Sequence, residues 1–304
     1  MQNVLVAGSE GALGKFVIKA LNQSGYQAIR AGRSVNNFEN KTDIIYPGDL
    51  KDDTFVKNIF VNHSIDYVIH CAALWNGYND DFEIVYNNII VMLNVLRYSQ
   101  NVKKFVMVSS SGVYENTELP YEDALLKPSS SYGISKLSCE KILTLRKPYT
   151  IWRPFHIVSP EEIYKEGSSH LLTNLSHKYI DNKQHIQLNS INGTNAISFT
   201  WVEDVASCIV NHLEDSRTEN EIFNLASEDQ ASVKAAAELF VINAQEVGLL
   251  PKFAVSQSPR QEFKSDGRFN KIYEILGWTA QTSFPDCIKK FLQYKYGIRT
   301  RKIN

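Results

Sequence analysis

The sequence lacks the features that mark secreted, membrane-spanning and nucleic-acid-binding proteins. Its four cysteines among 304 residues are far apart and include no C-x-x-C pair, so neither a disulfide framework nor a zinc ribbon is indicated. Lys and Arg (32) nearly balance Asp and Glu (33), and no long run carries one sign. A polybasic surface for nucleic acid or lipid is therefore not predicted. The apolar run over residues 88–96 is too short, and too interrupted by asparagine, to span a bilayer.

The start of the chain also lacks a signal-peptide pattern, because apolar residues 3–7 lead directly into a glycine-rich turn. We therefore expect a cytoplasmic protein with reduced thiols, and neither nucleic acid nor membrane as a partner. His70 and His156 have no cysteine or carboxylate pattern beside them, so no metal site is predicted. With 43% hydrophobic residues, the chain can bury one large core, or a core plus a smaller lobe.

Short β-branched runs alternate with helical patterns through the first half of the chain. This alternation predicts an α/β fold with a doubly wound parallel sheet and binding at the carboxyl ends of its strands. The expected strands are 3–7, 27–31, 43–46, 67–70, 104–108 and 150–153. The expected helices are 13–24, 51–62, 83–99 and 131–145. Beyond Pro160 we expect mainly helix over 161–188, a strand over 196–201, a helix over 202–213 and a returning strand over 222–226.

A glycine triplet at spacing three follows the first strand and opens the first helix. In that context the first glycine permits a tight turn, the second lets a diphosphate approach the backbone, and the third allows close helix–strand packing. The amides at the start of the helix then hold the anion. We expect a dinucleotide to be bound by Gly8, Glu10, Gly11, Ala12, Leu13 and Gly14.

The end of the second strand discriminates between NAD and NADP. An acid there would accept the adenosine ribose hydroxyls, whereas a base would pair with a 2′-phosphate. The segment carries no acid, and Arg33 with Ser34 follows the strand, so NADP is preferred and NAD stays an alternative. After the third strand, Asp49 and Leu50 are expected near the adenine edge.

Three further residues predict an oxidoreductase site. Tyr132 and Lys136 lie one helical turn apart on the same face, 22 residues after Ser110 at the end of a strand. A free phenol has a pKa of about 10 and is a poor base at neutral pH, but a nearby ammonium favours the phenolate. The phenol can then exchange a proton with a substrate oxygen as hydride moves at the adjoining carbon, while Ser110 orients that oxygen.

A second Y-x-x-x-K pattern, Tyr179 to Lys183, has no serine-bearing strand before it. We therefore assign it to packing or to the surface.

In combination, these motifs resemble the extended short-chain dehydrogenase/reductases, often called NAD-dependent epimerase/dehydratases. The resemblance covers almost the whole chain. It also includes segments that match the fourth strand with its alanine turn, the asparagine-bearing helix, the turn after the sixth strand and two late signatures: 66–73, 88–96, 153–156, 199–205 and 276–278.

The resemblance implies a Rossmann-type domain over 1–160, to which 195–226 returns, and a substrate lobe made of 161–194 and 227–304. It also implies a homodimer formed through the helices near 83–99 and 131–145, whose apolar faces would serve equally well as monomer core. The further cofactor contacts that it implies are Ala72, Ala73, Asn88, Val108, Tyr132, Lys136, Pro154 and Phe155. The substrate contacts expected are Trp75, Ser110, Ser111, His156 and Arg260. Tyr78 and Tyr114 could also stack on a base or sugar, although core packing explains Tyr114 equally well.

Departures from the family pattern narrow the expected reaction. Ser111-Gly112 stands where sugar-nucleotide dehydratases carry an acid pair, so elimination is not expected. Ile197 replaces an arginine that usually contacts the substrate diphosphate, whereas Arg260 resembles another such arginine.

We therefore predict NADPH-dependent reduction of a nucleotide-linked keto-sugar, a 4-keto-6-deoxy sugar of surface-polysaccharide synthesis. The alternatives are an NAD-dependent epimerase, a reductase of a non-sugar ketone or aldehyde, and a non-enzymatic NADP sensor.

Overall fold

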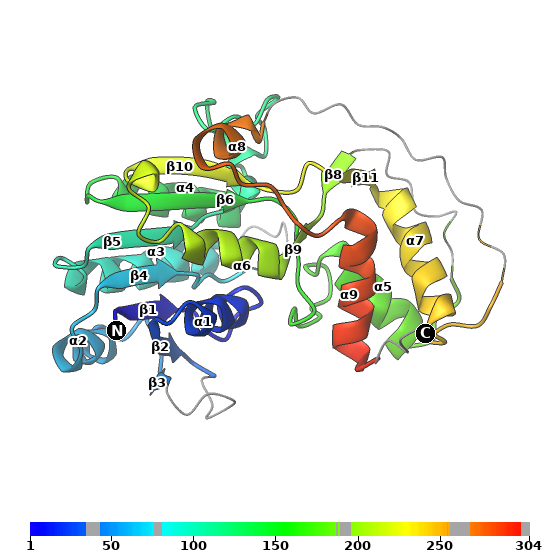
Figure 1. Cartoon of the computed structure of the whole chain (residues 1–304), viewed down its shortest axis with the longest axis horizontal. Coiled ribbons are helices and arrows are strands. Elements are labelled where there is room, and N and C mark those ends of the chain that lie inside the picture. Colours follow the sequence, from blue (N-terminus) through cyan, green and yellow to red (C-terminus); the bar gives the residue numbers. More distant parts are fainter. Residues whose placement is uncertain are drawn as a thin grey trace.

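The computed structural model describes residues 1–34, 43–75, 81–186, 188, 196–253, 255 and 268–298. Its main element is a parallel sheet of seven described strands in the order β10-β6-β5-β4-β1-β2-β3 (Figure 1). The strands are β1 (Asn3–Ala7), β2 (Gln27–Gly32), β3 (Ile44–Pro47), β4 (Tyr67–His70), β5 (Lys104–Val108), β6 (Tyr149–Pro154) and β10 (Glu221–Leu225). This confirms the predicted doubly wound fold, and the six predicted strands of the first half all form.

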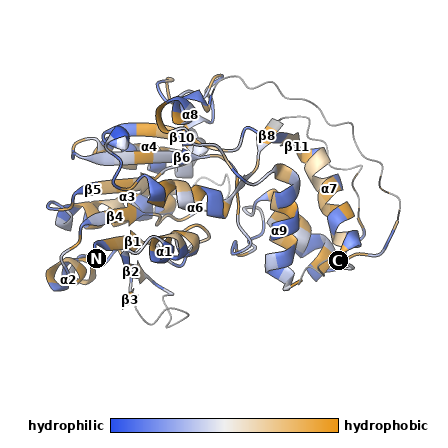
Figure 2. Cartoon of the chain, viewed as in Figure 1, coloured by the Kyte–Doolittle hydropathy of each residue, from blue (hydrophilic) through white to orange (hydrophobic). Residues whose placement is uncertain are grey.

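Helices cover both faces of this sheet, because successive residues of each strand point to opposite sides. In β1, Val4 and Val6 belong to one buried cluster, while Leu5 and Ala7 belong to the other. The first cluster includes residues of α1 (Gly14–Gln23) and α6 (Val202–Asn211). The second includes residues of α2 (Asp53–Asn62), α3 (Phe82–Tyr98) and α4 (Ser131–Leu143). Figure 2 shows the mainly hydrophobic strands between these helices.

Side chains outside the helices determine where three of them begin. Asp52 accepts hydrogen bonds from Thr54 N and Phe55 N at the start of α2, and Ser130 accepts one from Gly133 N at the start of α4. Such caps satisfy amides that have no partner within the helix. Asp81 caps α3 in the same way.

A second, smaller group of elements lies beside the sheet, at the right of Figure 1. Its helical segments are α5 (Leu171–Leu175), the π-helical turn η2 (Ser176–Asp181), α7 (Val233–Glu246) and α9 (Phe284–Tyr296). Other short elements are η1 (Ser111–Tyr114), β7 (Ile157–Val158), β8 (Ala196–Ser198), β9 (Thr200–Trp201), η4 (Ser216–Thr218), β11 (Gln230–Ser232) and α8 (Asn270–Leu276).

Two predictions for the second half need correction. Among its described residues the segment 161–188 is helical over 171–181 and at residue 188 only, since turns and the left-handed Gly167 (φ +72°) precede α5. The predicted strand 196–201 consists of two short strands with different partners, because β8 pairs with β11 and β9 pairs with β7. The predicted returning strand forms as β10 and joins the sheet, where it pairs with β6. The division into a nucleotide-binding domain and a substrate lobe stays a prediction.

In the described part of the chain, no helix combines the length and apolar character needed to cross a bilayer.

Candidate active site

The turn between β1 and α1 has the close backbone contacts that its glycines predict. Gly8 adopts a φ of +83°, and a Cβ placed on it would lie 2.7 Å from Ala72 Cα. A Cβ on Gly14 would lie 2.2 Å from the carbonyl oxygen of Gly8. The start of α1 has no side-chain cap and no acid in its first turn. This bare turn and uncapped helix start fit the diphosphate of a dinucleotide.

The other residues predicted to contact the cofactor here belong to this turn or follow β3 at the same end of the sheet. Leu50 is buried, and Asn94 Nδ2 donates to its carbonyl oxygen at 3.1 Å. Asp49 accepts a hydrogen bond from Lys51 N at 2.9 Å. Gly11 N donates to Gly8 O at 3.2 Å, and Ala12 O accepts from Ser159 Oγ at 2.7 Å; Leu13 is buried beside them.

Arg30 and Arg33, near the end of β2, differ in their surroundings. Arg30 is buried, and its guanidinium donates to Glu10 Oε1 at 2.6 Å and contacts Asp43 at 3.4 Å. Arg33 and Ser34 are exposed, and Arg33 has no ion pair with any described residue. Glu10 is therefore held by Arg30, while the Arg33 guanidinium faces solvent.

The three predicted catalytic residues come together where β5 ends and α4 begins. Lys136 is buried and its Nζ donates to Val108 O at 2.8 Å, 5.7 Å from the centre of the Tyr132 ring. Ser110 Oγ accepts from Gly112 N at 3.0 Å. A Cβ placed on Gly112 would lie 3.4 Å from Ser110 Oγ and 3.5 Å from Tyr132 Cδ1. The hydroxyl and the phenol ring therefore approach the same side of Gly112.

A buried ion pair lies beneath these groups, and the sequence reasoning missed it. Arg153 donates to both carboxylate oxygens of Glu140, at 2.9 and 2.7 Å, and both side chains are 2% exposed. Ser109 Oγ donates to the same carboxylate. Burial acts to lower the pKa of Arg153, but the hydrogen bonds to Glu140 outweigh it and raise that pKa. The sequence did offer a signal for Glu140: it lies four residues, one helical turn, after Lys136 and therefore on the same face of α4.

The sixth strand and the helix α3 supply the next predicted contacts. Pro154 and Phe155 are buried, and Phe155 stacks on Tyr114 with ring centres 5.9 Å apart. Tyr114 is a core residue, since its hydroxyl donates to Asn224 Oδ1 at 2.8 Å and burial raises its pKa to about 12. Asn88 is also buried, and its amide bonds the backbone of Leu74 and the Ser135 hydroxyl, so it orients the loop after β4. Ala72 and the exposed Ala73 lie in that loop.

The predicted substrate contacts partly converge. The Trp75 ring meets the Tyr132 ring edge-on, with centres 4.7 Å apart. Ser111, half-buried, follows Ser110. His156 follows β6 with a φ of +37°, and desolvation of its ring together with the charge of His170 lowers its pKa to about 4. Arg260 and Tyr78 lie outside the described residues.

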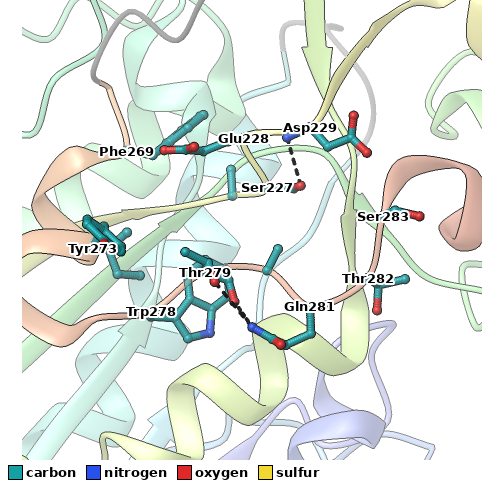
Figure 3. A pocket seen from close by; sticks show the side chains of 13 residues that line it. Ser227, Glu228, Asp229, Phe269, Tyr273, Trp278, Thr279, Gln281, Thr282 and Ser283 are labelled. Carbon is teal, nitrogen blue, oxygen red and sulfur yellow. Dashed lines mark hydrogen bonds between the residues drawn. The ribbon is translucent and has the colours of Figure 1, made fainter.

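Two cavities lie away from this group. One of about 330 Å³ follows β10 and is lined by Ser227, Tyr273 and Trp278 among others (Figure 3). Another of about 630 Å³ is lined by Tyr179, Lys183 and apolar residues around 249–253. Neither includes a predicted catalytic residue, so the chemistry is better placed at Tyr132. Among the described residues, no cluster of three or more potential metal ligands occurs.

Comparisons of the sequence with known proteins agree with this arrangement. The profile of the "NAD dependent epimerase/dehydratase family" matches residues 4–226. The chain is similar to a UDP-glucose 4-epimerase of Yersinia pestis, with 33% identity over 159 residues. That alignment covers 46% of this chain and 47% of the relative, so it spans just under half of each protein. A dTDP-D-glucose 4,6-dehydratase of Mus musculus is 25% identical over 96% of this chain and 88% of its own.

Solved structures show the same fold. The UDP-glucose 4-epimerase of Thermotoga maritima, solved with UDP-glucose, has a TM-score of 0.78 at 24% identity, covering 97% of this chain and 99% of its own. The Bifidobacterium longum enzyme, solved with NAD⁺ and UDP, has a TM-score of 0.77 at 24% identity, covering 97% and 98%. Because the family profile matches most of the sequence, the chain belongs to the NAD-dependent epimerase/dehydratase family, and the close-packed glycine turn between β1 and α1 agrees with this.

Proposed function

We propose that this chain reduces a keto group on a nucleotide-diphosphate sugar, a 4-keto-6-deoxy sugar, with NADPH as the reductant. The observation that carries the proposal is the convergence of Ser110 and Tyr132 over Gly112, with Lys136 fixed behind the phenol by Val108 O. A phenol, an ammonium and a hydroxyl in this arrangement serve proton transfer at a substrate oxygen.

The side chains divide the work of that transfer. Tyr132 donates its phenolic proton to the carbonyl oxygen, and the Lys136 ammonium stabilises the phenolate that remains. Ser110 donates a hydrogen bond to the same oxygen and orients it. The nicotinamide cofactor, when bound, supplies the hydride for the carbonyl carbon. Residues of the turn from Gly8 to Gly14 would hold its diphosphate, and Pro154 with Phe155 would form the wall beside the nicotinamide.

The preference for NADP rests on the end of β2. The two residues directly after this strand include no acid, and these residues, the exposed Arg33 and Ser34, stand where a 2′-phosphate would be contacted. Arg30 is committed to Glu10 and Asp43, so we assign the phosphate contact to Arg33.

The nucleotide-sugar class is supported by the names of the similar proteins, which are UDP-glucose 4-epimerases and a dTDP-glucose dehydratase. We assign substrate contacts to Trp75, Ser111 and His156, and to Arg260 outside the described residues. Dehydration is not proposed, because Ser111-Gly112 follows Ser110 in place of an acid pair.

An NAD-dependent nucleotide-sugar epimerase is the second candidate. The Yersinia similarity and the NAD⁺ bound to the Bifidobacterium enzyme favour it, and it would use the same three residues. Ile197, half-buried in β8 where the family resemblance predicts an arginine, favours a third candidate, a reductase of a non-sugar ketone or aldehyde.

A binding screen tests these candidates. Nucleotide-diphosphate sugars are titrated against the protein with NADPH and with NADH in parallel, and productive pairs are followed by cofactor absorbance. A net loss of NADPH with a keto-sugar nucleotide supports the reductase. Tightly retained NAD with turnover but no net absorbance change identifies the epimerase, and turnover of simple ketones alone identifies the third candidate.

We also propose a homodimer formed through α3 and α4, which pack side by side. Leu143 is buried and Ile89, Val91, Leu96 and Leu137 are half-buried against the core, whereas Phe82, Tyr86, Leu93 and Ile134 are exposed. Sedimentation of wild type and of a Phe82→Ser/Tyr86→Ser variant tests this, since a monomer in both cases would refute it.

A cytoplasmic location fits the four free cysteines of this chain.

A further inference from the structure

The indole of Trp75 connects the catalytic phenol to a segment of the smaller group of elements. Its ring meets Tyr132 edge-on at 4.7 Å, and its Nε1 donates to the carbonyl oxygen of Ser168 at 2.7 Å. Residues near 168 are therefore held against the face of the site where a substrate would lie. The hydroxyl of Ser168 is buried and has no hydrogen-bond partner among the described residues.

A histidine stacks on the same indole. The His170 ring lies 6.4 Å from the Trp75 ring, at an interplanar angle of 18°. Its Nδ1 lies 2.7 Å from Glu162 Oε1, and its backbone N donates to the same oxygen at 3.1 Å. The second oxygen of Glu162 accepts from the Thr173 hydroxyl at 2.5 Å. Glu162 is thus fixed by three donors, and it fixes the imidazole in turn.

The environment of His170 favours its charged form. Burial acts to lower the pKa of His170, but the hydrogen bond to Glu162 outweighs it and raises that pKa. Burial acts to raise the pKa of Glu162, and the same bond lowers it. His156 also interacts electrostatically with His170, and its own lowered pKa of about 4 keeps it neutral near pH 7. The carboxylate of Glu162 thus favours the protonated imidazole of His170.

The remaining ring nitrogen of His170 is free to bind a ligand. Nδ1 faces Glu162, no described residue is hydrogen-bonded to Nε2, and the side chain is 49% exposed. Trp75 and His156 follow strands β4 and β6 at their carboxyl ends, the edge at which parallel sheets bind ligands. A charged N–H at this edge is a donor for an oxygen anion.

We propose that His170 forms an anion subsite for the phosphate groups of the substrate, with Glu162 as the positioning residue that maintains its charge. This rests on the proposed function and deepens it, because it makes nucleotide-sugar affinity depend on pH. His170 loses its proton as pH rises through its raised pKa, so the affinity is highest in mild acid and falls toward alkaline pH.

Calorimetric titration of the NADP⁺-saturated protein tests the proposal. UDP-glucose is the probe, since both its phosphates are esterified and its charge stays constant between about pH 5 and 8. The wild type is expected to lose about tenfold in affinity across this range, the loss of one charge-assisted hydrogen bond. His170→Gln should bind weakly at every pH. Glu162→Gln should move the midpoint of the profile to lower pH. Equal NADP⁺ binding by all variants shows that they are folded.

His177→Gln is the matched control, because His177 also lies on this segment but contacts Tyr164 and Asp181, away from the Trp75 stack. It should reproduce the wild-type profile. A flat wild-type profile, or a His170→Gln profile equal to wild type, overturns the subsite while leaving the nucleotide-sugar assignment intact. Sulfate serves as a second probe. If UDP-glucose does not bind but sulfate binds in a His170-dependent manner, the subsite stands and the proposed substrate class falls. Binding of neither probe refutes both.

Discussion

The Nζ atom of Lys136 lies 5.7 Å from the centre of the Tyr132 ring, and the carbonyl oxygen of Val108 holds it there at 2.8 Å. The ammonium is buried, so little water screens its effect on the phenol. These two residues, one turn apart on α4, are the ones that we propose act together in proton transfer.

Removing either member of this pair should abolish most turnover. Tyr132→Phe and Lys136→Met are each expected to lower kcat by about 100- to 10,000-fold, the usual contribution of a positioned acid–base group. Steady-state rates with the nucleotide sugar identified by the binding screen give the measurement. Lys183→Met is the control, since Lys183 has the same spacing from a tyrosine but lines a different cavity. A Tyr132→Phe enzyme with full activity would contradict the assignment.

Arg33→Ala should discriminate between the two cofactors. Loss of a charged contact to a 2′-phosphate weakens NADPH binding by about 10- to 100-fold, while NADH binding stays unchanged. Fluorescence titration with both cofactors measures the difference. Arg97→Ala, at an exposed residue of α3 paired with Asp53, should affect neither. Equal weakening for both cofactors, or none, would remove the argument for an NADPH-dependent reductase.

Gly8→Ala should destabilise the protein more than Gly25→Ala does. Both glycines have a φ near +80°, so both variants carry the strain of a left-handed alanine, about 1–2 kcal/mol. Only at position 8 would the new Cβ also meet a neighbour, 2.7 Å from Ala72 Cα, whereas nothing lies within 4 Å at Gly25. Urea unfolding of the two variants separates crowding from strain. Equal losses would show that the contact between Gly8 and Ala72 is not tight in solution.

Breaking the buried pair between Glu140 and Arg153 should be strongly destabilising. Glu140→Gln leaves the guanidinium uncompensated at 2% exposure, which costs about 3–5 kcal/mol. Asp53→Asn breaks the exposed pair with Arg97 and should cost at most about 1 kcal/mol. Denaturant unfolding measures both free energies. A small loss for Glu140→Gln would mean that the pair does not hold α4 against β6.

Acid should destabilise the fold through His70. This residue is buried, neither ring nitrogen has a hydrogen-bond partner among the described residues, and burial together with Lys136 lowers its pKa to about 3. The unfolded chain therefore binds a proton that the folded state excludes, and stability falls as pH drops below about 6.5. His70→Met should reduce this slope by up to about 1.4 kcal/mol per pH unit. An unchanged slope between about pH 6 and 4 would place the loss in other groups.

The first half of the fold and the pairing of Tyr132 with Lys136 follow from local sequence. Strand and helix patterns in this half are short and regular, and the spacing from Tyr132 to Lys136 is itself a helical repeat. The glycine triplet predicts its own close contacts, because only residues without a Cβ can approach Ala72 and the Gly8 carbonyl so closely.

In two segments of the second half, the local sequence pattern did not predict the observed structure. The segment 196–201 reads as one strand, yet each half finds a partner from a different part of the chain. In 161–188 polar residues and a left-handed glycine break the helix before residue 171, and contacts with distant elements rather than local propensity determine its path.

Periodicity and spacing along the chain thus specify the individual strands and helices, the glycine turn after β1 and the Tyr132–Lys136 pair, since each depends on residues close in sequence. The contacts among Trp75, Tyr132 and His170 and the pair formed by Glu140 and Arg153 exist only after folding. They join segments that no local repeat relates, and packing against the sheet brings those segments within bonding distance.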